Sequence, residues 1–95
     1  MEAEINGMRA EINGLVEILE SRSDTKQSSL RTLQLYRRSF VESVEECQDS
    51  DAVEDAEIRA LYNENLRSAH QRYVRMLMKV LGMPLAQEVP ASLLV

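Results

Sequence analysis

The apolar residues of this chain recur at steps of three and four along three separate segments, and this spacing restricts the fold to amphipathic helices. Near the N-terminus, AEINGMR at 3–9 is followed directly by AEINGLV at 10–16, so a seven-residue unit is written twice. Each copy supplies one a and one d position of a heptad, which places its apolar residues on one side of a helix. The resulting stripe over residues 2–21 consists of Ile5, Met8, Ile12, Leu15 and Leu19.

Two longer segments repeat the pattern and predict two further helices. The second starts at about residue 24 or 28 and ends near 48, and the third runs from about 52 to 81. Asp51 and Glu54 fit a capping box at the start of the third helix, and Gly82 with Pro84 is a stop signal at its end. Three glycines and two prolines are too few for a turn-rich β fold, so we predict an all-α protein.

We predict one helical domain over residues 1–95, divided into three parts. Residues 1–21 form an N-terminal amphipathic helix, residues 24–82 form a helical hairpin, and residues 83–95 form an extended tail that ends on apolar residues. The hairpin is predicted because the connection between its two helices is short and polar, which favours antiparallel neighbours.

The glycines of the N-terminal repeat, Gly7 and Gly14, fall away from the apolar stripe. Each costs about 0.5–1 kcal/mol relative to alanine, and so short a helix is marginal alone in water. We therefore expect it to form by docking on another surface. Two alternatives are open: it covers the domain's own core, or it associates with a partner or a second copy as a coiled coil.

The hairpin carries more apolar surface than two helices can bury between themselves. Leu35 and Val41 lie off the stripe of the second helix, and Leu77 and Leu81 lie beside the stripe of the third. This excess predicts a second copy of the chain or a different protein, and a homodimer with four long helices is the assembly we favour. The candidate partner-binding residues are Ile5, Met8, Ile12, Leu15, Leu19, Leu35, Val41, Met76, Leu77 and Leu81.

Charge is sorted along the predicted hairpin. Residues 42–57 hold eight acids and no base, whereas the bases cluster at 26–38 and 67–79. The hairpin is thus acidic at its turn and basic at its open end. Three roles are open for these charges: they form faces that are simply solvated, they guide a partner electrostatically, or they contact nucleic acid. The net charge of −5 argues against nucleic acid as the main partner.

No catalytic, cofactor or metal site is predicted. His70 and Cys47 are the only residues of their kinds, and the acidic turn lacks the central glycine of a calcium loop. No serine lies in G-x-S-x-G and no glycine-rich phosphate loop is present. We therefore expect a protein without enzyme activity or cofactor. A lone cysteine and the lack of a secretion signal or of a run of ~20 apolar residues favour the cytoplasm over a membrane.

Parts of the two hairpin helices match a known pattern. The third helix carries Tyr62-x-Glu64, then His70, and ends in Leu81-Gly82 with Pro84. The second carries Arg37-Arg38 followed by Val41-Glu42 and Glu46. Together they resemble the TraM-type quorum-sensing antiactivators over about half of the chain, although the N-terminal repeat has no counterpart in that family. The resemblance implies a small helical dimer that binds a LuxR-type transcription factor and keeps it from DNA.

The sequence as a whole predicts a regulator that binds and masks another protein. The alternatives are a secretion-type chaperone and a structural or assembly component in which the N-terminal helix drives higher oligomers.

Overall fold

The computed structural model describes residues 2–50 and 53–82, and the predicted all-α fold is confirmed. The described residues form three helices, α1 (Glu2–Glu20), α2 (Gln27–Asp49) and α3 (Ala56–Leu81). No strand occurs within these two ranges. The predicted extended tail at 83–95 lies outside the described residues.

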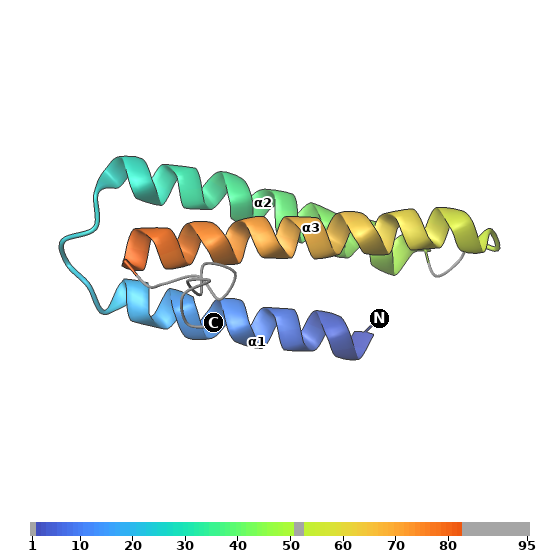
Figure 1. The fold of residues 1–95 in the computed structure, drawn as a ribbon, viewed down its shortest axis with the longest axis horizontal. Helices are drawn as coiled ribbons and strands as arrows, with labels where there is room; N and C mark the ends of the chain where they lie inside the picture. The colour runs from blue at the N-terminus through green and yellow to red at the C-terminus, as the bar shows by residue number, and fades with distance from the viewer. Residues whose placement is uncertain (1, 51–52, 83–95) are drawn as a thin grey trace, which may run out of the picture.

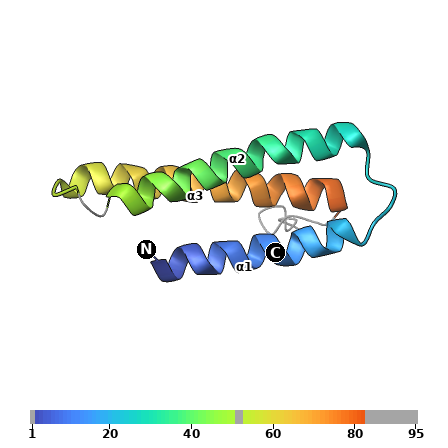
Figure 2. The same cartoon turned by 180° about the vertical axis from the view of Figure 1, so that it is seen from behind.

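The helix α3 lies in the middle of the molecule, with α1 on one side and α2 on the other (Figure 1). Along the chain the helices run up, down and up, so α2 and α3 form an antiparallel hairpin while α1 runs in the same direction as α3 (Figures 1 and 2). Extensive packing joins α2 to α3 and α1 to α3, whereas α1 and α2 scarcely contact each other. The central helix therefore holds the fold together.

The hydrophobic core follows both flanks of α3. Leu66 and Leu77 are fully buried, because α3 has a neighbour on each side. Complete burial of a leucine side chain contributes about 1.5–3 kcal/mol. The core cluster is formed by Ile5, Met8, Ile12 and Leu19 of α1, Leu33, Phe40, Val44 and Cys47 of α2, and Leu66, Tyr73, Leu77 and Leu81 of α3.

The prediction that Leu77 and Leu81 belong to the excess apolar surface is wrong. Their exposed fractions are 0% and 4%, since α1 and α2 together cover a wider face of α3 than one heptad stripe. At the other end of α3 an apolar side chain is left on the surface, since Ile58 is 41% exposed. Glu4 of α1 reaches Arg67, so α1 begins too far along α3 to cover its first turns.

The start of α3 also differs from the prediction. Asp55 is the N-cap, and its carboxylate accepts hydrogen bonds from the backbone N–H groups of Glu57 at 2.9 Å and Ile58 at 3.4 Å. The predicted capping box at Asp51 would start the helix about four residues too early, and Asp51 itself lies outside the described residues. The predicted stop is confirmed: Gly82 has φ = 71° and ends α3 in the left-handed conformation.

The glycines give a test of whether α1 belongs to the cooperative fold. A Cβ atom at Gly7 or Gly14 meets nothing within 4 Å, so the double change Gly7→Ala with Gly14→Ala should raise the free energy of unfolding by about 1–2 kcal/mol. As the opposite control, Gly82→Ala should lower it by about 1 kcal/mol because of the positive φ. Urea unfolding followed by circular dichroism measures both. A double variant without added stability would mean that α1 unfolds separately from the hairpin.

Candidate protein-binding surfaces

Two polar contacts fix α1 on α3. The guanidinium of Arg67 donates to both carboxylate oxygens of Glu4, at 2.8 and 3.1 Å. These hydrogen bonds hold the pKa of the Glu4 carboxyl below its ordinary value and raise the pKa of Arg67. Further along, His70 Nε2 lies 3.8 Å from Glu11 Oε1. Acids of α1 thus face the basic part of α3, which sets the register of the two helices.

The side chain of His70 lies where the three helices meet. Its ring packs against Phe40 of α2 with the centroids 6.2 Å apart, and its Nε2 points toward Glu11 of α1. The Nε2 atom is buried and has no hydrogen-bond partner among the described residues. His70 is therefore a packing residue of the interior with a loose polar contact at its tip.

The apolar stripe of α1 is used inside the chain. Ile5, Met8, Ile12 and Leu19 are buried and belong to the core cluster, while Leu15 is half-buried against it. Of the two alternatives for α1, the structure shows the first, in which α1 docks on the domain's own core. In this conformation four of these side chains are covered by the chain itself, and Leu15 is covered in part.

Of the other candidate partner-binding residues, only two remain on the surface. Met76 is half-buried and packs on the core, and Leu77 and Leu81 are inside it. Leu35 and Val41 are exposed to 65% and 44%, which are large fractions for apolar side chains. They mark two separate surfaces of the molecule.

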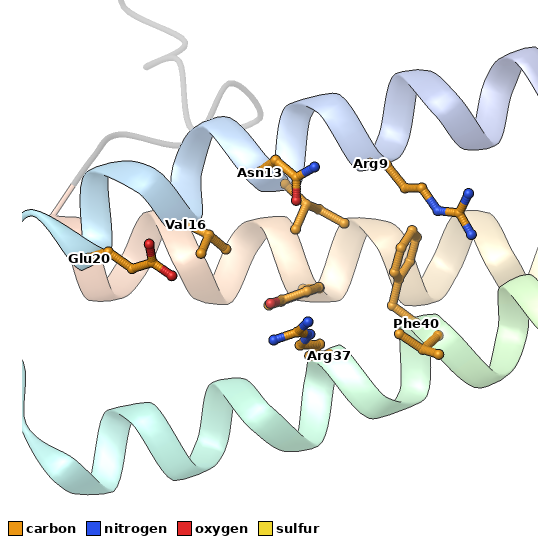
Figure 3. Close-up of a pocket in the computed structure, with 9 residues that line it drawn as sticks. Arg9, Asn13, Val16, Glu20, Arg37 and Phe40 are labelled. Carbon is orange, nitrogen blue, oxygen red and sulfur yellow. The ribbon is translucent and has the colours of Figure 1, made fainter.

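The first surface is a groove between α1 and α2, here named the α1–α2 groove (Figure 3). It exists because both helices pack on α3 and not on each other. Its volume is about 360 Å³, within the range of binding pockets in proteins. It is lined by Arg9, Ile12, Asn13, Val16 and Glu20 of α1, Arg37, Phe40 and Val41 of α2, and Tyr73 of α3.

The floor of the α1–α2 groove is apolar and its rim is charged. Ile12, Phe40 and Tyr73 form the buried floor. Burial raises the pKa of the Tyr73 phenol, and the positive charge of Arg37 offsets part of that shift. Arg37 thus stands close enough to the floor to act on it electrostatically.

The second surface, here named the outer hairpin face, is built only from α2 and α3. Its centre is a shallow depression of about 220 Å³ lined by Leu35, Tyr36, Ser39, Ala69 and Arg72. On α2, steps of four, three and four lead from Leu35 through Ser39 and Glu42 to Glu46, and the same steps on α3 lead from Leu61 through Asn65 and Ser68 to Arg72. Leu61, like Leu35, is 65% exposed.

Several residues that line the α1–α2 groove were not among the candidate partner-binding residues predicted from the sequence. Arg9, Asn13, Val16 and Glu20 follow one another at steps of four, three and four, so they form a strip along one side of α1. The spacing is visible in the sequence, but its meaning depends on α1 contacting only α3. Leu61 was not a candidate either, and it is exposed whereas the candidates Leu77 and Leu81 are buried.

Two further findings concern the described residues. They contain no group of three or more His, Cys, Asp or Glu side chains placed to hold a metal ion. None of their helices has the length and apolar character needed to cross a bilayer.

Comparison with known proteins leaves the surfaces as the main guide. No protein-family model matches the chain, and no curated protein and no solved structure is similar enough to count as a match. The two surfaces are therefore the basis for assigning a function.

The Glu4–Arg67 contact predicts a pH dependence. Since the pKa of Glu4 is lowered in the folded state, its contribution to stability is present at neutral pH and is lost as the pH falls through that lowered value. Glu4→Gln should therefore lower the urea midpoint slightly at pH 7 and leave it unchanged in acid strong enough to protonate the Glu4 carboxyl. Glu17→Gln is the matched control, because Glu17 has no ion pair among the described residues. Equal effects of both changes at pH 7 would contradict the assignment.

Proposed function

We propose that this protein is a regulator without enzyme activity, which binds and masks another protein and acts as a homodimer. The observation that carries the proposal is the outer hairpin face, where Leu35 and Leu61 each leave 65% of their surface in contact with solvent. Single exposed leucines are common on monomers, but Leu35 lies in a depression with Tyr36 and Ala69. Leu61 lies on the same side of α3 as Arg72, which also lines that depression. A second copy is the simplest cover for such a face, because symmetric dimers are the commonest oligomers.

The spacing of the two leucines suits an antiparallel dimer. Cys47 Sγ donates to the backbone carbonyl of Tyr62, so the start of α3 lies level with the end of α2. Leu61 is then about 20 Å along the hairpin from Leu35, at 1.5 Å per residue. A twofold axis midway between the two side chains, lying across the helices, brings Leu35 of each copy to the level of Leu61 of the other.

The distribution of charge favours the same orientation. The outer hairpin face is basic at its open end, where Arg72 lies, and acidic toward its turn, where Glu46 lies. In the antiparallel arrangement, Arg72 of one copy comes level with Glu46 of the other, twice. A parallel arrangement would bring like charges together, which costs free energy at an interface.

The dimer is tested by substitution on the outer hairpin face. The double variant Leu35→Asp with Leu61→Asp should be monomeric in sedimentation velocity runs at several concentrations, whereas the wild type should be a dimer. Ile18→Asp is the matched control, because Ile18 is 42% exposed but lies on α1 outside both surfaces. Arg72→Glu should weaken the dimer roughly fivefold to tenfold, and adding Glu46→Arg should restore most of that loss. A wild type that stays monomeric at high concentration would refute the dimer.

The partner that best fits the sequence is a transcription factor. The resemblance of α2 and α3 to TraM-type antiactivators supports a LuxR-type protein, which the dimer would keep from its DNA. The acidic net charge of the chain suits this role, since such a regulator has no need to contact DNA itself.

Masking is tested with a purified LuxR-type factor from the same genome and its operator DNA. Addition of the dimer at equal molar amounts should abolish the mobility shift of the DNA. The monomeric Leu35→Asp, Leu61→Asp variant should require at least roughly tenfold more protein if masking needs the dimer. An unchanged shift in the presence of excess dimer would exclude the antiactivator role.

The packing of α1 bears on the assembly-component alternative. That alternative needs the heptad stripe of α1 free for higher oligomers, but Ile5, Met8 and Ile12 are buried against the core. The regulator is favoured over the scaffold for this reason, and growth beyond a dimer with rising concentration would reverse the preference.

A further inference from the structure

We propose that the α1–α2 groove binds one amphipathic α-helix of the partner protein, and that this helix completes a four-helix bundle with α1, α2 and α3. The inference rests on the proposed function, because it assumes a protein partner. It goes further by naming the site, the kind of partner segment and its charge pattern. The groove is distinct from the outer hairpin face, so both can be occupied in one complex.

The arrangement of the three helices leaves one corner of a bundle open. A helix placed across from α3 would pack against α1 and α2 at once, as in four-helix bundles. The side chains of Asn13, Val16 and Phe40 extend into the space between the two ribbons (Figure 3). A groove that runs between two helices and is open along one side suits an elongated segment better than a compact small molecule.

The groove has the length and the apolar floor that a docking helix needs. From Arg9 to Glu20 the lining of α1 covers about 16 Å, or three helical turns. Ile12, Phe40 and Tyr73 form the floor, and Val16 and Val41 form its partly exposed edges. A helix with apolar anchors at positions i, i+4 and i+7 would place one anchor per turn along this floor.

The rim determines the charge pattern of that helix. Arg9 lies at one end of the groove beside Phe40, and Glu20 lies at the other end (Figure 3). Arg37 lies on the opposite wall, across from Asn13 (Figure 3). None of these three charged side chains has an ion pair among the described residues. The partner helix should therefore carry acidic residues near Arg9 and Arg37 and a basic residue near Glu20.

The experiment uses a displayed library of helix-forming peptides about five turns long, with leucine fixed at i, i+4 and i+7 and the other positions varied. Peptides selected on the full-length protein should carry Asp or Glu toward one end and Lys or Arg toward the other. In fluorescence anisotropy, the double variant Val16→Glu with Val41→Glu should bind them at least roughly tenfold more weakly. Ile18→Glu is the matched control and should bind like the wild type, since Ile18 is equally exposed but outside the groove.

A second arm tests the charge pattern. Arg9→Glu together with Arg37→Glu should reverse the selection, so that the enriched peptides carry bases where the first set carried acids. Circular dichroism and sedimentation of each variant check that helix content and oligomeric state are kept. A selection that yields no helical binder, or binders that tolerate Val16→Glu with Val41→Glu, would overturn the inference.

Other occupants of the groove give different results. If Val16→Glu with Val41→Glu converts a dimer into a monomer, a second copy fills the groove and the inference is wrong. If peptides bind only after Leu93, Leu94 and Val95 are changed to serine, the chain's own C-terminal segment fills it and the inference is wrong. If a masked partner is bound equally well by the groove variants, the inference fails while the proposed function stands.

Discussion

The structure depends on the burial of α3 on two sides. Leu66 and Leu77 of this helix are fully buried because α1 covers one of its flanks and α2 covers the other. Burial of apolar surface is the main favourable term for a chain this small, which hides only about 60–65% of its unfolded surface. With one helix shared by two neighbours, each apolar residue of α3 stabilises the contact with α1 or with α2. The cost of the arrangement is that α1 and α2 do not cover each other.

Both candidate binding surfaces follow from that cost. The α1–α2 groove is the space between α1 and α2, which both pack on α3 but not on each other. Its floor consists of core residues that no fourth element covers among the described residues. The outer hairpin face is the side of α2 and α3 that α1, lying on the other side of α3, cannot reach. Three helices thus build a stable core and still leave apolar surface for other molecules, which is the physical basis of the proposed binding and masking role.

Charged contacts determine how the helices are aligned, but they contribute little to the stability of the fold. The Glu4–Arg67 pair is exposed, so water and salt screen it, and it fixes the register of α1 more than it stabilises the fold. In the proposed dimer, the sorted charges of the hairpin would likewise favour an antiparallel arrangement over a parallel one. If the groove binds a helix as proposed, Arg9, Arg37 and Glu20 would select among apolar helices that otherwise fit alike.

The sequence alone determined the number and type of the elements. Steps of three and four predict helices because they match the helical repeat, and Gly82 marks the end of α3 because only glycine adopts a positive φ without strain. The seam of α1 was also readable, since Ile5, Met8 and Ile12 repeat in a heptad. These are local properties, which the chain carries whatever it packs against.

Only the tertiary structure decided which apolar residues are hidden. Leu77 and Leu81 were predicted to be excess apolar surface, yet they are buried because α1 and α2 together cover a wide face of α3. Leu61 is exposed because it lies on the outer hairpin face, which α1 cannot reach. Likewise, the groove exists only because α1 and α2 both pack on α3 and not on each other. The periodicity of a helix shows which of its faces is apolar. Which other helix covers that face depends on contacts between residues far apart in the chain, and a local sequence pattern does not contain this information.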